Sequence, residues 1–167
     1  MTAALNARGV VLCPDPICHS TLTQPAQAVA ALDDIAGWDG FRLCQDSFQH
    51  FRASDAQIFP DRVGLIHISG IARPDLSPAN LTEPDRGFVC AGDRVDNVTR
   101  LRAIVQSKTG KPLVILRVSL IRVNPIKRDS LYQGFVSIEP ISPATQTDPQ
   151  IASRLRDSIA HVPGALQ

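Results

Sequence analysis

Short apolar runs that end in a polar residue recur along the chain. Each run passes directly into a stretch that contains turn-forming residues. Runs this short and this apolar are typical of strands that are buried on both faces, as in a parallel sheet. We therefore predict four strands, at residues 9–15, 41–46, 63–69 and 134–139.

Helical periodicity occupies the intervals between these runs. Apolar positions recur every three or four residues in three segments, which we predict to be helices: residues 24–36, 96–106 and 151–161. Strands that alternate with helices form βαβ units, in which right-handed crossovers join parallel strands. The sequence thus predicts an α/β protein with a parallel sheet, in a single domain over residues 1–167.

One segment, residues 107–130, departs from this pattern. It carries six basic residues against one acidic residue, although the net charge of the whole chain is only +1. Its apolar centre, residues 112–123, has strand propensity and is an alternative last strand. It ends in no catalytic side chain, so we favour 134–139 and interpret 107–130 as an atypical basic insert. A basic RNA- or lipid-binding face is the weaker interpretation, because no aromatic residues are interleaved with the basic ones.

Composition and charge argue against several classes of protein. A net charge of +1 at pH 7 gives no electrostatic reason for a nucleic-acid or membrane partner. No apolar run approaches the roughly 18 residues of a membrane-spanning helix, and the N-terminus lacks the layout of a secretory signal. We therefore expect a cytoplasmic protein. The four cysteines form no CxxC pair, and Cys13 and Cys44 lie in apolar runs where we interpret them as small core residues.

Each predicted strand finishes with a side chain that can bind a metal ion. These strand-end residues are Asp15, Asp46, His67 and Glu139. In a barrel of parallel strands the carboxyl ends converge on one mouth, so we expect the four side chains to lie close together. Three carboxylates and one imidazole suit Mn²⁺, Mg²⁺ or Co²⁺ better than a thiolate-seeking metal. The pattern predicts a divalent-metal site with open positions for a hydroxy-ketone.

Four motifs in the chain resemble a known family. They are LIHISG at 65–70, LTEPDR at 81–86, GDRVDN at 92–97 and SIEPISP at 137–143. Together they are similar to the xylose-isomerase-like barrel family of sugar (phosphate) isomerases and epimerases. The resemblance implies a partial (β/α)8 TIM barrel, about four βα units that correspond to strands five to eight. That is the C-terminal half of the barrel.

The resemblance also implies roles for individual side chains. The four strand-end residues would be the metal ligands, and Asp15 and Glu139 would in addition transfer a proton through an enediolate of a ketose or hydroxy-ketone. His50 and Arg73 would bind the substrate. Asp15 stands where the family has a glutamate, which is longer by one methylene group. The implied activity is that of an isomerase or epimerase that needs no redox cofactor.

A half barrel leaves other functions open. Met1 stands just before the predicted fifth strand, so we expect the first four strands to be missing from the sequence. Open sheet edges favour a partner chain that carries the N-terminal half, or self-association. Alternatively the chain is an inactive remnant or a structural half that needs such a partner. An endonuclease-like metal-dependent phosphodiesterase is a further alternative, although that activity requires a richer set of ligands.

Overall fold

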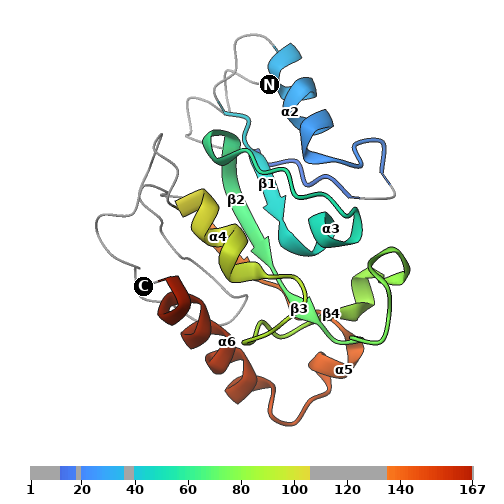
Figure 1. Cartoon of the computed structure of the whole chain (residues 1–167), viewed down its shortest axis with the longest axis vertical. Coiled ribbons are helices and arrows are strands. Elements are labelled where there is room, and N and C mark those ends of the chain that lie inside the picture. The colour runs from blue at the N-terminus through green and yellow to red at the C-terminus, as the bar shows by residue number, and fades with distance from the viewer. Residues whose placement is uncertain (1–11, 18–19, 36–39, 106–134, 167) are drawn as a thin grey trace.

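A computed structural model of the chain describes residues 12–17, 20–35, 40–105 and 135–166. Its centre is a three-stranded parallel sheet in the order β1-β2-β5, flanked by helices (Figure 1). The elements are α2 (Pro25–Asp34), β1 (Leu43–Asp46), α3 (Ser47–Arg52), β2 (Val63–Ile68), β3 (Gly70–Ile71), β4 (Arg86–Gly87), α4 (Asn97–Val105), β5 (Phe135–Ile138), α5 (Pro143–Gln146) and α6 (Ile151–Leu166). Single 3-10 turns lie at Pro60–Arg62, Pro78–Asn80 and Glu83–Asp85.

The predicted parallel α/β arrangement is confirmed. Strands β1, β2 and β5 lie within three of the predicted strands, and α2, α4 and α6 lie at the three predicted helices. The prediction at 9–15 extends beyond the described residues, but its described part runs beside β1. Leu12 forms a parallel bridge with Phe41, and the Cys44 amide donates to the Pro14 carbonyl at 2.9 Å. The predicted insert at 107–130 lies outside the described residues.

The apolar core lies on one face of the sheet. Helices α4 and α6 cover this face, with Leu101 and Leu155 among the side chains that they bury (Figure 1). Opposite them Ile66 and Ile68 of β2 are only 2% and 1% exposed. Burial of one such side chain contributes about 1.5–3 kcal/mol. The core therefore fixes which face of each strand is turned toward the helices.

The other face of the sheet carries the polar strand ends. Side chains alternate along a strand, so His67 faces away from its buried neighbours Ile66 and Ile68. In the register of the sheet Asp46 pairs with His67, and His67 pairs with Ser137. The ladder continues past β5, since the Glu139 amide donates to the Ile68 carbonyl at 2.9 Å. The strands thus bring their carboxyl ends to one level.

A small antiparallel hairpin follows β2 and crosses the end of the sheet. It is formed by β3 and β4, with Gly70 opposite Gly87. A Cβ atom on Gly70 would lie 2.0 Å from the Phe88 carbonyl oxygen, so only glycine permits this close approach. The hairpin places Arg86, the first residue of β4, beside the carboxyl end of β1.

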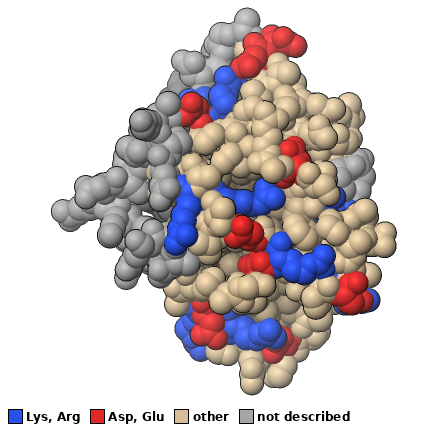
Figure 2. Space-filling model, in the orientation of Figure 1, with Lys and Arg blue, Asp and Glu red and all other residues tan. Residues whose placement is uncertain are grey.

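The described surface is mixed in charge. On the face shown in Figure 2, acidic and basic side chains are interspersed, with no broad area of one sign among the described residues. Within the same residues, no helix has the length and apolar character that crossing a membrane requires.

Candidate metal centre

Asp46 stands where β1 passes into α3, and this junction fixes its carboxylate. As the N-cap of α3, the side chain accepts hydrogen bonds from the backbone amides of Phe48 at 2.8 Å and Gln49 at 3.2 Å. An N-cap aspartate satisfies amides that the first helical turn leaves without partners. The Asp46 side chain is completely buried. Its position is therefore set by the local fold.

Arg86 holds the same carboxylate from the opposite side. Its guanidinium binds Asp46 in a two-pronged manner, with nitrogen–oxygen distances of 2.5 and 3.2 Å. It also donates to Glu83 at 2.7 Å and lies 4.6 Å above the centre of the Phe48 ring. Burial alone would lower the pKa of Arg86, but the hydrogen bonds and charges of Asp46 and Glu83 outweigh it and raise that pKa. Arg86 is thus a fixed positive charge at the carboxyl end of β1.

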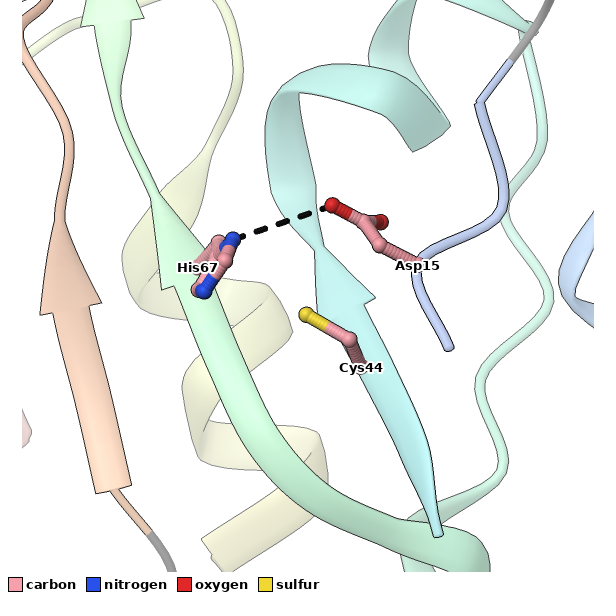
Figure 3. Close-up of side chains that lie close together, drawn as sticks. All are labelled: Asp15, Cys44 and His67. Carbon is pink, nitrogen blue, oxygen red and sulfur yellow. Dashed lines mark ion pairs between the residues drawn. The ribbon is translucent and has the colours of Figure 1, made fainter. Parts of the chain in front are cut away.

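His67 is the point at which the strand-end carboxylates meet. Its Nδ1 atom lies 3.2 Å from Glu139 Oε1 and 3.7 Å from Asp15 Oδ2. Figure 3 shows Asp15 and His67 pointing toward each other, with the Cys44 sulfur on the same side. One oxygen of Asp46 also belongs to this group, because the donor atoms of Asp46, His67 and Glu139 lie within 4.8 Å of one another. The structure therefore brings together all the predicted strand-end ligands around His67.

The two carboxyl groups beside His67 are electrostatically unusual. Burial, with the negative charges of Asp46 and Glu139, raises the pKa of Asp15 to about 8, although Arg86 opposes this. Burial also raises the pKa of Glu139, with His67 and Arg86 acting in the opposite direction. Among the described residues, Asp15 Oδ1 is buried and has no hydrogen-bond partner. Buried carboxylates in this state favour either a proton or a bound cation.

The distances from His67 to its two carboxylate neighbours are those that ligands of one ion have. An ion held about 2.0–2.3 Å from each ligand places neighbouring donor atoms roughly 3.0–3.8 Å apart. The two distances from His67 Nδ1, 3.2 and 3.7 Å, fall in this range. Two groups of donors share His67, namely Asp46 with Glu139, and Asp15 with Cys44. The donor set as well as the spacing therefore fits a divalent metal ion.

The two residues assigned to substrate binding lie apart from this cluster. His50 is buried, its ring within 2.8 Å of the Gln45 amide nitrogen, and burial followed by the charge of Arg100 lowers its pKa to about 4. Gln45 alternates with Asp46 along β1, so His50 lies with the side chains on the helical side of the strand. Arg73 is mostly exposed and pairs with Asp75 at 2.8 Å. Each of the two residues thus has a local partner, and the role of both in substrate binding stays a prediction.

Arg86 and Cys44 are the side chains that the sequence interpretation did not place at the centre. Arg86 belongs to the LTEPDR motif at 81–86, but it lies in a strand of two residues that has no periodicity to reveal it. Cys44 was interpreted as a core residue, and it is buried. Its spacing of two residues from Asp46 was the signal that it shares the inward face.

Comparisons with known proteins show what the fold resembles. No family model and no curated protein sequence matches the chain. Three solved structures do match. A xylose isomerase domain protein from Alicyclobacillus acidocaldarius has a TM-score of 0.67 and 17% identity, over 99% of this chain and 53% of its own. The chain has the fold of half a xylose-isomerase-like TIM barrel.

The other matches agree with this. The IolI protein, solved with a bound zinc atom, has a TM-score of 0.65 and 14% identity, over 98% of this chain and 51% of its own. A xylose isomerase domain-containing protein from Salmonella typhimurium has a TM-score of 0.62 and 16% identity, over 99% and 52% of the two chains. The chain thus spans about half the length of each of these structures.

Proposed function

We propose that Asp15, Asp46, His67 and Glu139 bind one divalent metal ion, and that the site serves a sugar isomerase or epimerase reaction. The main observation behind this proposal is the position of His67 Nδ1, which lies 3.2 Å from a carboxylate oxygen of Glu139 and 3.7 Å from one of Asp15. Support comes from the location of the cluster at the carboxyl ends of parallel strands, where barrel enzymes build their active sites. The zinc atom in the IolI structure is consistent with a metal in this fold.

The charge balance of the cluster supports a cation at this position. Asp46 is already compensated by Arg86, through two hydrogen bonds in a fully buried pair. Within the described part of the chain, Asp15 and Glu139 have no such partner of their own: Arg86 comes within 3.7 Å of Glu139 but bonds closely to Asp46 and Glu83. A divalent ion would match the two remaining negative charges and remove the cost of burying them.

The proposed chemistry is proton transfer next to a carbonyl group. A bound ion would polarise adjacent carbonyl and hydroxyl oxygens and so acidify the intervening C–H bond. We propose that Asp15 and Glu139, which lie 3.7 and 3.2 Å from His67 Nδ1, are the two groups that remove and return the proton. Arg86 supplies a positive charge for an enediolate oxygen.

The substrate would be a ketose or another hydroxy-ketone. The barrels that the chain matches are about twice its length, so the opposite wall of the mouth would come from a second barrel half. We propose that this half, in the same polypeptide or another, encloses the substrate. Orientation in an enclosed site can supply roughly 7–11 kcal/mol of barrier reduction. Turnover is therefore expected only when both halves are present.

Metal binding tests the proposal before any substrate is known. We expect saturable binding of one Mn²⁺ ion per chain, measured by the loss of the free-ion electron paramagnetic resonance signal. His67→Ala and Glu139→Gln should each weaken binding by at least roughly tenfold. Asp75→Asn, which changes an exposed aspartate paired with Arg73, is the matched control and should bind as the wild type does.

The activity test follows with ketoses and hydroxypyruvate as substrates. The chain is assayed with the ion, alone and mixed with an N-terminal barrel half. Solvent deuterium incorporated at the carbon next to the carbonyl would report proton abstraction. Equal Mn²⁺ affinity in the wild type, His67→Ala and Glu139→Gln would remove the metal centre, and with it the proposed reaction.

A further inference from the structure

Cys44 occupies the lower edge of the candidate metal centre. It lies on β1 two residues before Asp46, and its side chain is buried, with 1% of its surface exposed. Its Sγ atom lies within 4.8 Å of donor atoms of both Asp15 and His67. Figure 3 shows the three side chains converging from three adjacent segments of the sheet. The sulfur therefore faces the same space as the carboxylate and the imidazole.

A role as an ordinary core residue does not account for these surroundings. The core on the helical face of the sheet is formed by other side chains of β2 and β5, and Cys44 is not part of it. Its neighbours Asp15 and His67 are instead polar and ionisable. Among the described residues Asp15 Oδ1 is buried and lacks a hydrogen-bond partner, which is costly unless a ligand is bound there. The thiol and Asp15 Oδ2, the carboxylate oxygen that faces His67, point to one ligand.

The distances allow an ion that binds all three residues. A zinc ion lies about 2.3 Å from a cysteine sulfur and about 2.0–2.2 Å from histidine nitrogen and carboxylate oxygen atoms. Neighbouring donor atoms around such an ion are about 3.3–3.8 Å apart. The Asp15–His67 distance of 3.7 Å lies in this range, and all the donor atoms of the group lie within 4.8 Å of one another. Small side-chain movements would complete the contacts.

We propose that Cys44 is a ligand of the metal ion, together with Asp15 and His67, and that its sulfur makes the site prefer Zn²⁺ or Co²⁺ to Mg²⁺ or Mn²⁺. Thiolate is a soft ligand that strengthens binding of zinc and cobalt and adds little for the hard ions. When the ion binds, the sulfur–metal bond forms and the thiol releases its proton to the solvent. The inference rests on the proposed metal centre and deepens it, because it decides which ions the centre takes.

The absorption spectrum of bound Co²⁺ tests the role of Cys44 separately from the presence of a metal site. Co²⁺ bound at a site of low symmetry absorbs in the visible region whatever its ligands are, whereas a cobalt–thiolate bond adds a charge-transfer band in the near ultraviolet. We expect titration of the full chain with Co²⁺ to produce both signals at one equivalent. Cys44→Ser should lose the near-ultraviolet band and keep the visible one. Cys90→Ser, which changes an exposed cysteine, is the matched control and should keep both.

Competition between ions gives a second readout. Zn²⁺ should displace Co²⁺ from the wild type at stoichiometric concentration, while Mg²⁺ should fail to do so. Cys44→Ser should lower the preference for Zn²⁺ over Mg²⁺ by roughly 10–100-fold. X-ray absorption of the zinc-loaded wild type should show one sulfur neighbour at about 2.3 Å, and this measurement does not depend on whether the variant folds.

Three results would overturn the inference. Visible bands without a near-ultraviolet band in the wild type would leave the metal centre in place and exclude Cys44 as a ligand. A near-ultraviolet band that persists in Cys44→Ser would assign the sulfur to another cysteine. Absence of saturable Co²⁺ and Zn²⁺ binding would remove the proposed function together with the inference.

Discussion

The raised pKa of Asp15 predicts an unusual dependence of stability on pH. The folded chain without metal keeps a proton on Asp15 up to about pH 8, whereas the unfolded chain releases it near the ordinary value of 3.8. Between these values the folded state binds more protons than the unfolded state. The free energy of unfolding therefore falls as the pH rises through this window, the reverse of the usual behaviour of a paired aspartate.

The magnitude follows from the width of the window. Each unit of pKa difference is worth about 1.4 kcal/mol, so the shift from 3.8 to about 8 corresponds to at most about 6 kcal/mol. The Asp15 side chain is 26% exposed, and solvent screening lowers the effect. His50, whose pKa is lowered to about 4, makes a contribution of opposite slope below its unfolded value of about 6.5. Between pH 6.5 and 8 the contribution of Asp15 dominates that of His50, and we expect the free energy of unfolding to fall by about 1.5 kcal/mol.

Urea denaturation in the presence of a chelator measures this loss. Wild type, Asp15→Asn and the exposed control Asp75→Asn are compared at pH 6.5, 7, 7.5 and 8, a series that spans about 1.5 units below the pKa of Asp15. We expect the free energy of unfolding to fall by about 1.5 kcal/mol more in the wild type and in Asp75→Asn than in Asp15→Asn. Glu139 contributes a slope of the same sign in all three proteins; because its charge interacts with Asp15, the difference reports Asp15 together with this interaction. Parallel curves for the wild type and Asp15→Asn would refute the reasoning.

The remaining predictions concern the supports of the centre. Arg86→Met should lower the free energy of unfolding by roughly 3–5 kcal/mol, because it leaves the buried Asp46 carboxylate without its partner. Arg86→Lys should recover part of this loss in the same urea titration. A loss under about 1 kcal/mol for Arg86→Met would contradict this prediction. Gly70→Ala should cost roughly 3 kcal/mol or more, since the new Cβ meets the Phe88 carbonyl. Gly92→Ala, where the space is open but φ is +77°, should lower the free energy of unfolding by only about 1–2 kcal/mol. An equal loss for Gly70→Ala and Gly92→Ala would show that the β3–β4 hairpin shifts to make room for the Cβ atom at position 70.

The sheet and most of the centre follow from the sequence for a physical reason. A parallel strand buried on both faces reads as a short apolar run, and its carboxyl end is marked where a polar residue replaces the apolar ones. Asp46 and His67 were located in this way, and the register places them opposite each other. The carboxyl ends of neighbouring strands lie side by side at one edge of the sheet when the strands are parallel and begin at the same level. The proximity of Glu139 to His67, at 3.2 Å, is a consequence of this geometry.

The arginine and the histidine near the centre could not be inferred in the same way. Arg73 follows His67 closely in sequence, but it lies in an exposed loop and pairs with Asp75. Arg86 is farther along the chain and reaches Asp46 only because the close approach of Gly70 to Phe88 folds the hairpin back. Such a contact depends on loop geometry, which leaves no periodic signal in the sequence. The orientation of His50 likewise depends on the entry angle of a helix of one and a half turns.

The charges at the mouth divide into two groups, and this division explains why the centre needs an added cation. Asp46 and Glu83 are neutralised by Arg86 and Arg52, through contacts of 2.5, 2.7 and 3.1 Å. This network is closed: each of its carboxylates has a guanidinium partner, and the N-cap of α3 adds two amide donors to Asp46. It would remain intact whether or not a metal ion were present.

Asp15 and Glu139 form the second group: both face His67, and Glu139 has only a 3.7 Å contact with Arg86. Without a metal ion, burial keeps a proton on Asp15 at neutral pH, and the pKa of Glu139 is raised as well. A divalent ion would replace this proton and balance both carboxylates, while Asp46 keeps its hydrogen bonds to Arg86. Metal affinity should therefore rise with pH up to about 8, as the proton on Asp15 is lost. The site thus couples proton release to metal binding, while Arg86 keeps the surrounding carboxylates in place.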